Sequence, residues 1–98
     1  MDYQALLTEI TSRAAKTGPL GNTLKFSFGD GDPIYLDGTG DENVVSSEDK
    51  EADCTIKISR ENLGKLMDGS LNPMMAFMGG KVKVDGDLGV AMKLQSLV

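Results

Sequence analysis

The acidic residues between positions 30 and 42 are the first candidates for a chemical site, because carboxylates can bind calcium. Five of them lie within thirteen residues: Asp30, Asp32, Asp37, Asp41 and Glu42. A calcium loop that began at Asp30 would need an oxygen ligand at its fifth position, which is Ile34. The calcium pattern therefore fails, and solvated hairpin turns, in which Asp and Gly are favoured, explain these residues better.

The other reactive side chains form no catalytic pattern. The sequence has no histidine, which excludes Ser-His-Asp, Cys-His and His-metal sites within the chain. The one cysteine, Cys54, falls on the apolar side of a predicted strand, where a thiol is usually inert. The glycines at positions 79, 80, 86 and 89 match neither the dinucleotide fingerprint nor the Walker pattern. We therefore expect a protein that is not an enzyme and that uses no cofactor and no metal.

A cluster of methionines is more informative than the polar residues. The segment 72–80, NPMMAFMGG, holds three of the six methionines, Met74, Met75 and Met78. Methionine is unbranched and polarisable, so it adapts to partners of irregular shape. Such a cluster can be ordinary core packing, or it can be the wall of a pocket for an apolar ligand.

The last predicted helix, residues 88–98, carries two apolar stripes. One comprises Leu88, Ala91, Met92 and Gln95, and the other includes Val90, Leu94, Leu97 and Val98. A helix that is apolar on two sides is normally buried on both, and a chain of this size has little else to cover the second side. That side is left for a ligand, a partner chain or a segment outside this sequence, unless the helix lies at the centre of the core.

Composition limits the classes of function. The chain of 98 residues suits a single domain, 1–98, and its 40% apolar and 26% charged residues predict a folded, soluble protein. The net charge of −5 argues against a nucleic-acid partner, although Lys81, Lys83 and Lys93 could form a local basic patch. We expect at most transient membrane contact, and the charged N-terminal residues and the lack of a membrane-spanning apolar run predict a cytoplasmic protein.

Hydrophobic periodicity predicts the elements that would position these residues. A helix begins near Tyr3 and ends at Gly18-Pro19, and a last helix follows a cap at Asp87. Strands are predicted at 24–28, 33–38, 43–46, 52–59 and 81–86, with helices at 59–69 and 72–80 between the last two. Each strand has one apolar and one polar face, so we expect helices on a single face of the sheet. The segment 59–80 is also long enough for a crossover between parallel strands.

The second half of the chain resembles the sterol carrier protein type-2 family of lipid-transfer domains. The matching segments are ADCTIKIS (52–59), a helix with Leu63, Leu66 and Met67, and GSLNPMMAFMGGKVKVDGDLGVAMKLQSL (69–97). The resemblance implies an α+β fold, with a five-stranded mixed, mostly antiparallel sheet, helices packed on one face, and an elongated apolar tunnel between them. It also implies a carrier of fatty acids, fatty acyl-coenzyme A, sterols or phospholipids.

We therefore expect non-catalytic binding and transfer of a lipid or fatty acyl ligand. The predicted lining residues are Phe26, Phe28, Met67, Met75, Phe77, Met78, Leu88 and Met92, with Gln95 as a polar contact near one end. The alternative is a structural module, in which the stripe that includes Val90 and Leu94 forms a homodimer or docks on an enzyme partner.

Overall fold

The computed structural model describes residues 2–97 of the chain. The elements follow in the order α1 (Tyr3–Lys16), β1 (Thr23–Ser27), β2 (Ile34–Asp37), β3 (Val44–Ser46), β4 (Cys54–Lys57), α2 (Arg60–Asp68), α3 (Pro73–Met78), β5 (Lys83–Gly86), α4 (Leu88–Met92) and the 3-10 helix η1 (Lys93–Ser96). The predicted last helix is thus split, because the α-helix gives way to a 3-10 helix after Met92. None of the helices in this part of the chain has both the length and the apolar character that a membrane span requires.

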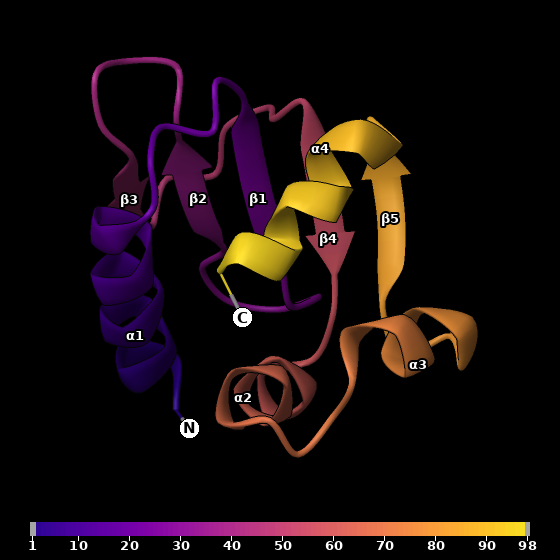
Figure 1. The fold of residues 1–98 in the computed structure, drawn as a ribbon. Coiled ribbons are helices and arrows are strands. Elements are labelled where there is room, and N and C mark those ends of the chain that lie inside the picture. The colour runs from indigo at the N-terminus through magenta and orange to yellow at the C-terminus, as the bar shows by residue number, and fades with distance from the viewer. Residues whose placement is uncertain (1, 98) are drawn as a thin grey trace.

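The five strands form one mixed sheet in the order β3-β2-β1-β4-β5. Strands β1 and β4 are parallel, and the other three neighbouring pairs are antiparallel, which confirms the predicted α+β architecture. The segment 59–80 is long enough for a crossover between parallel strands, but it does not form one, since β4 and β5 are antiparallel. Helices α2 and α3 stay at the end of the sheet where β4 finishes, so the chain re-enters the sheet in the opposite direction (Figure 1).

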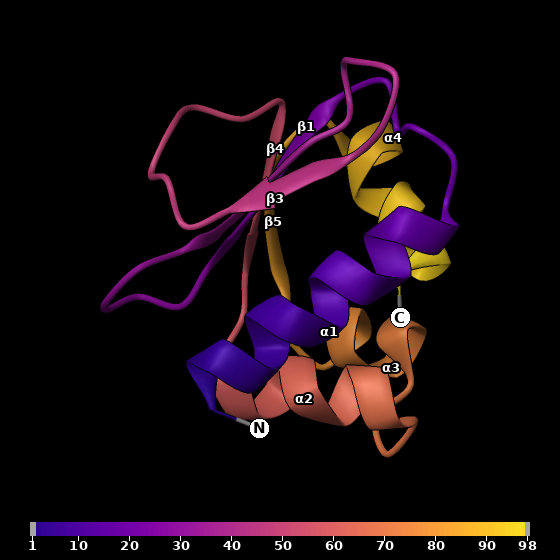
Figure 2. The same ribbon diagram turned by 90° about the vertical axis from the view of Figure 1, so that its left-hand side faces the viewer.

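All four α-helices lie on one face of the sheet, as Figures 1 and 2 show together. The core lies between the sheet and the helices. Alternate side chains of the strands point toward the helices, and these apolar side chains are fully buried. Its largest buried side chains include Leu24, Phe26, Leu36 and Ile56 from the strands and Leu6, Ile10 and Leu63 from the helices.

Strand β2 departs from the prediction of one polar face for every strand. Residues Ile34, Tyr35 and Leu36 are all buried, so both faces of this strand are covered. The segment that follows β3 covers the outer face at Tyr35. The Tyr35 hydroxyl donates to the carbonyl oxygen of Glu51 at 3.4 Å, and the Lys50 ammonium lies 6.0 Å from the ring centroid.

The predicted helix caps are observed at Ser59, Asn72 and Asp87. Each side-chain oxygen accepts a hydrogen bond from a backbone N–H in the first turn of the helix that follows it. Helix α1 ends at Lys16 with Thr17 as its C-cap, directly before the predicted terminator Gly18-Pro19. The predicted ends of the two middle helices are confirmed as well, because Gly69 follows α2 and Gly79 follows α3 directly.

Candidate functional site

An apolar cavity of ≈ 300 Å³ lies between α3, α4 and strands β4 and β5. It is lined by Ile56, Pro73, Met74, Phe77, Val82, Val84, Leu88, Ala91, Met92, Leu94 and Gln95. Among these lining residues, Gln95 alone has a polar side chain. Small-molecule sites span roughly 300–1,000 Å³ and are mostly apolar with a few polar groups, so this cavity has the character of such a site at the lower end of the range.

The floor of the cavity is continuous with the hydrophobic core. Ile56 and Val84 are directly opposite each other in the β4–β5 register, and Ile56 is fully buried. Val82, on the same side of the sheet, and Leu94 from η1 are buried as well. An apolar group that enters the cavity would therefore meet a dry, packed surface.

The rim of the cavity consists of large apolar side chains that face solvent. Met74 and Phe77 on α3 are 58% and 49% exposed, and Leu88 and Met92 on α4 are 61% and 67% exposed. Single exposed apolar side chains are common on protein surfaces, but a contiguous group of them marks an interaction site. The cavity is therefore open to solvent between the two helices.

The position of helix α3 depends on its N-terminal cap and on one small buried residue. Asn72 Oδ1 accepts hydrogen bonds from the N–H groups of Met74 and Met75, and Pro73 occupies the first helical position. Ala76 is the one buried residue of α3, and its carbonyl oxygen accepts the N–H group of Lys81 at 2.9 Å. Because alanine is small, the helix lies close to the core while its larger side chains project to the sides.

Helix α4 is placed by a sharp turn after β5 that requires glycine. Gly86 has φ +114°, and a Cβ atom there would lie 2.5 Å from the backbone oxygen of Asp53. The same oxygen accepts the N–H group of Asp87 at 3.0 Å, and the Asp87 carboxylate caps α4. The turn sends α4 back across β4 and β1, as Figure 1 shows.

Two basic side chains hold the C-terminal segment against the first quarter of the chain. The Lys93 ammonium donates to the carbonyl oxygen of Leu20 at 2.6 Å and to Asn22 Oδ1 at 2.7 Å. The Arg13 guanidinium donates to the carbonyl oxygen of Leu97 at 3.3 Å. Sequence reasoning missed both anchors, because their acceptors lie more than seventy residues away and two of them are backbone atoms.

The structure brings four of the nine predicted lining residues to the cavity, namely Phe77, Leu88, Met92 and Gln95. It places Phe26 and Met67 in the core, with 0% and 5% exposure. Strand alternation and helical spacing mark both as facing inward, but they cannot separate a side chain that fills the core from one that borders a cavity.

Met75 and Met78 lie outside the cavity, with 70% and 79% of their surfaces exposed. Since Ala76 faces the core, helical geometry turns Met75 and Met78 to the side next to the one that carries Met74 and Phe77. The missed lining residues are Ile56, Pro73, Met74, Val82, Val84, Ala91 and Leu94. For Val82 and Val84 the sequence did contain a signal, because their alternation with lysines predicts that both side chains point inward.

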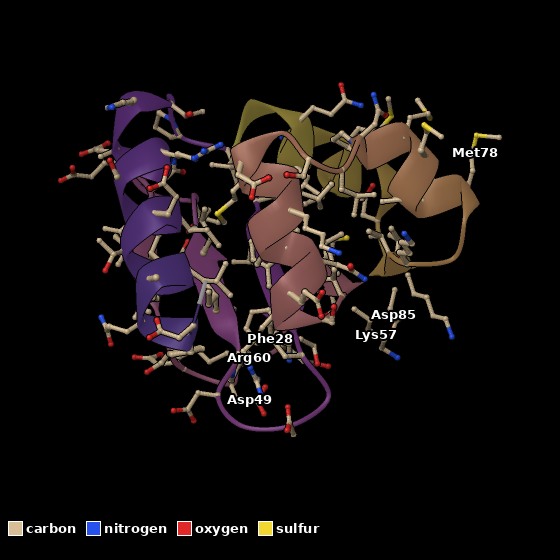
Figure 3. All side chains as sticks on the ribbon, turned by 90° about the horizontal axis from the view of Figure 1, so that it is seen from below. Phe28, Asp49, Lys57, Arg60, Met78 and Asp85 are labelled. Carbon is tan, nitrogen blue, oxygen red and sulfur yellow. The ribbon has the colours of Figure 1, made fainter. Side chains whose placement is uncertain are left out.

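Phe28 does not line the cavity and lies near Arg60 at the start of α2, as the labels in Figure 3 show. Its ring packs edge-on against Tyr3 with the centroids 6.2 Å apart, and the Arg60 guanidinium carbon lies 5.4 Å from the Phe28 centroid. Arg60 also pairs with Asp30 at 2.8 Å. This arrangement closes the turn at 29–32, so it explains Phe28 without a ligand.

The stripe predicted as an interaction surface on the last helix is not on the surface. Val90, Leu94 and Leu97 are 3%, 7% and 1% exposed, and Val98 lies outside the described residues. They are buried because α4 and η1 lie across the middle of the sheet. The other stripe, with Leu88 and Met92, is the one that faces solvent.

A second, shallower groove has a volume of ≈ 590 Å³ but a polar wall. It is lined by Ser27, Phe28, Gly29, Lys57, Ile58, Ser59, Asn62, Gly80, Lys81 and Lys83. The larger volume does not make it the better site for an apolar ligand, because three of its side chains are cationic. Lys93 of the predicted basic patch is elsewhere, on the anchor to Leu20.

Two titratable groups of the described residues, Cys54 and Asp53, have shifted pKa values that follow from their surroundings. Cys54 is fully buried, and burial raises the pKa of its thiol, which therefore stays protonated at neutral pH. Hydrogen bonds from the Thr23 backbone and the Asn22 side chain lower the pKa of the Asp53 carboxyl, which serves to join β1 to the start of β4. Between residues 2 and 97 there is no group of three His, Cys, Asp or Glu side chains that could hold a metal ion.

Comparisons with known proteins agree with this geometry. The sequence profile described as the SCP-2 sterol transfer family matches residues 4–98. "Sterol carrier protein 2" of Oryctolagus cuniculus is 50% identical over 58 residues, which are 59% of this chain and 11% of that protein, so the chain matches only a small part of the relative.

Two solved structures from Aedes aegypti share the fold. The crystal structure of Sterol Carrier Protein 2 Like 2 aligns with a TM-score of 0.76 and 17% identity over 97% of this chain and 94% of that one. The solution structure of palmitated SCP2L2 aligns with a TM-score of 0.76 and 18% identity over 96% of this chain and 91% of that one.

Proposed function

The chain belongs to the SCP-2 sterol transfer family, and from that membership we propose that it binds and transfers lipid, with the apolar part of the lipid in the cavity between α3 and α4. One observation carries the proposal. Four large apolar side chains surround the mouth of a dry cavity and remain largely exposed, and a bound hydrocarbon would remove that surface from water. The proposed role is non-catalytic.

We propose a linear acyl chain, as a fatty acid or fatty acyl-coenzyme A, as the preferred ligand. The cavity is small, and its one polar side chain, Gln95, is exposed on the last turn, where it could contact a headgroup that stays outside. Each buried methylene contributes about 0.8 kcal/mol, so eight of them would contribute on the order of 6 kcal/mol before the costs of ordering. The palmitated Aedes aegypti protein supports the view that this fold can hold an acyl chain.

A matched pair of variants tests the location of the ligand. Met92 and Met75 are similarly exposed, at 67% and 70%, but only Met92 lines the cavity. Met92→Asp places a carboxylate against the bound hydrocarbon. We expect this change to weaken the binding of a fluorescent fatty acid by at least about tenfold, because a loss of about 1.4 kcal/mol of apolar contact lowers the affinity by that factor. Met75→Asp should stay within about twofold of the wild type, since its side chain does not border the cavity.

The titration is done in vesicle-free buffer, with cholesterol and palmitate as competitors. The proposal predicts saturable binding that palmitate displaces more effectively than cholesterol. Equal loss of binding in both methionine variants would show that the cavity is not the site. The absence of saturable binding in the wild-type protein would refute the carrier function itself.

A further inference from the structure

Strands β1 and β4 are the parallel pair of the described sheet, and their connections leave in opposite directions. In the order β3-β2-β1-β4-β5, the chain passes from β1 to β2 on one side and from β4 through α2 and α3 to β5 on the other. Figure 1 shows both strands ending on the side of the sheet where α2 lies. In open α/β sheets, such a divergence leaves a crevice at the carboxyl ends of the strands, and ligands bind there.

The polar groove described above lies at these two carboxyl ends. Ser27 and Phe28 come from the end of β1, Lys57 is the last residue of β4, and Ser59 caps α2. The N–H group of Ile58 donates to the carbonyl oxygen of Ser27 at 3.1 Å, so the two strands are still joined where the groove begins. Its volume of ≈ 590 Å³ is within the range of small-molecule sites.

The charged lining residues of the groove are all cationic: Lys57, Lys81 and Lys83. Ser27 and Lys83 are the register partners of Lys57 on its two sides, so these three residues form one row across the sheet. The row is on the face away from the helices, because Ile56 and Val84, which alternate with it, point into the apolar cavity. The groove thus gathers positive charge on a chain whose net charge is −5.

Two of the three ammonium groups have no acidic partner within the protein. Asp85 lies 3.9 Å from Lys57 in an ion pair, and both are labelled in Figure 3, which views the molecule from this end of the sheet. None of the ion pairs between residues 2 and 97 includes Lys81 or Lys83. These two side chains are therefore available to an external anion.

The start of α2 adds neutral donors that favour the same sign of charge. Ser59 Oγ accepts the N–H group of Asn62 at 3.1 Å, so its hydroxyl proton can donate to a ligand, and the Asn62 side chain also lines the groove. The positive end of the helix macrodipole points to the same place. Glu61, in the same turn, pairs with Lys65 at 3.3 Å and does not line the groove.

We propose that the groove binds a phosphate group, carried either by a soluble molecule or by a lipid headgroup. A phosphate monoester has a charge of about −1.5 to −2 and three strong acceptor oxygens. The unpaired ammonium groups of Lys81 and Lys83 and the donors of Ser59 and Asn62 match that charge and those oxygens. The groove shares no lining residue with the apolar cavity, so the inference does not depend on the proposed carrier function.

Isothermal titration calorimetry of the full chain tests the charge of the site. The probes are pyrophosphate and the water-soluble lipid dihexanoyl phosphatidic acid, and we expect saturable binding of at least one. Lys81→Gln with Lys83→Gln should weaken that binding by at least about tenfold, because charge-assisted hydrogen bonds are lost. The control, Lys16→Gln with Lys50→Gln, makes the same change in net charge outside the groove and should stay within about threefold of the wild type.

A matched pair at Ser27 tests the location of the site. Ser27→Glu places a carboxylate beside Lys57 and should weaken binding by at least about tenfold, whereas Ser27→Gln, of nearly the same size, should stay within about threefold. Circular dichroism checks that both variants fold.

The two probes also identify the source of the phosphate group. Tighter binding of pyrophosphate supports a soluble ligand, and tighter binding of the lipid supports a headgroup. The inference is overturned if neither probe binds saturably, if the two double-lysine variants lose the same affinity, or if Ser27→Glu and Ser27→Gln behave alike. Equal losses would mean that an adventitious ion is held by general charge and not by this groove.

Discussion

Replacement of Gly86 by alanine should destabilise the protein strongly, because both the backbone conformation and the surrounding space at this position exclude a side chain. The backbone at Gly86 has φ +114°, a region that costs a side-chain-bearing residue about 1–3 kcal/mol. The new Cβ would also lie 2.5 Å from Asp53 O and 3.1 Å from Cys54 Cα. These are backbone atoms of the neighbouring strand and cannot rotate away, so overpacking adds about 1–3 kcal/mol.

We therefore expect Gly86→Ala to lower the free energy of unfolding by about 3 kcal/mol, after a small gain from the stiffer unfolded chain. Urea denaturation followed by far-ultraviolet circular dichroism measures this value. Gly40→Ala is the matched control, because its φ is not positive and a Cβ there would meet no atom within 4 Å. It should be neutral or slightly stabilising. A Gly86→Ala protein within about 1 kcal/mol of the wild type would refute the claim that this turn dictates glycine.

Two further predictions concern Lys93 and Asp53, whose side chains join segments that are far apart in the sequence. Lys93→Met removes the charged donor to Leu20 and Asn22 and should lower the free energy of unfolding in urea by about 1.5–3 kcal/mol; an unchanged midpoint would contradict the anchoring role. The lowered pKa of Asp53 means that its carboxylate stabilises the fold above the unfolded pKa of about 3.9, and that this contribution is lost as pH falls through that value and below it. Between about pH 5 and about pH 3 the wild type should therefore lose more stability than Asp53→Asn, and parallel pH profiles would disprove the linkage.

Local signals in the sequence were sufficient for the elements and their caps. Ser59, Asn72 and Asp87 cap helices as predicted, because capping depends on residues within one turn. The pairing of strands was less accessible. The helical segment between β4 and β5 is long enough to connect either parallel or antiparallel strands, and in the structure the two strands are antiparallel.

The cavity could be predicted only in part, because its wall depends on which side of each helix meets the core. The methionine cluster at 72–80 forms α3, which does border the cavity. Because Ala76 is the residue of α3 that faces the core, Met75 and Met78 face solvent. The stripe of the last helix with Leu88, Met92 and Gln95 lines the cavity as predicted, whereas the stripe with Val90 and Leu94 does not form the exposed interaction surface of the alternative prediction. The stripe with Val90 is buried because α4 lies over the middle of the sheet, where the core covers that side of the helix.

Helix α3 is attached to the core through very little buried surface. Ala76 is the one buried residue of this helix, so little apolar area opposes its detachment, whereas Ile56 on β4 is fully buried. Segments with few buried contacts open at a small fraction of the free energy of global unfolding. Helix α3 can therefore open locally at a lower free energy than the sheet, which keeps its hydrogen bonds.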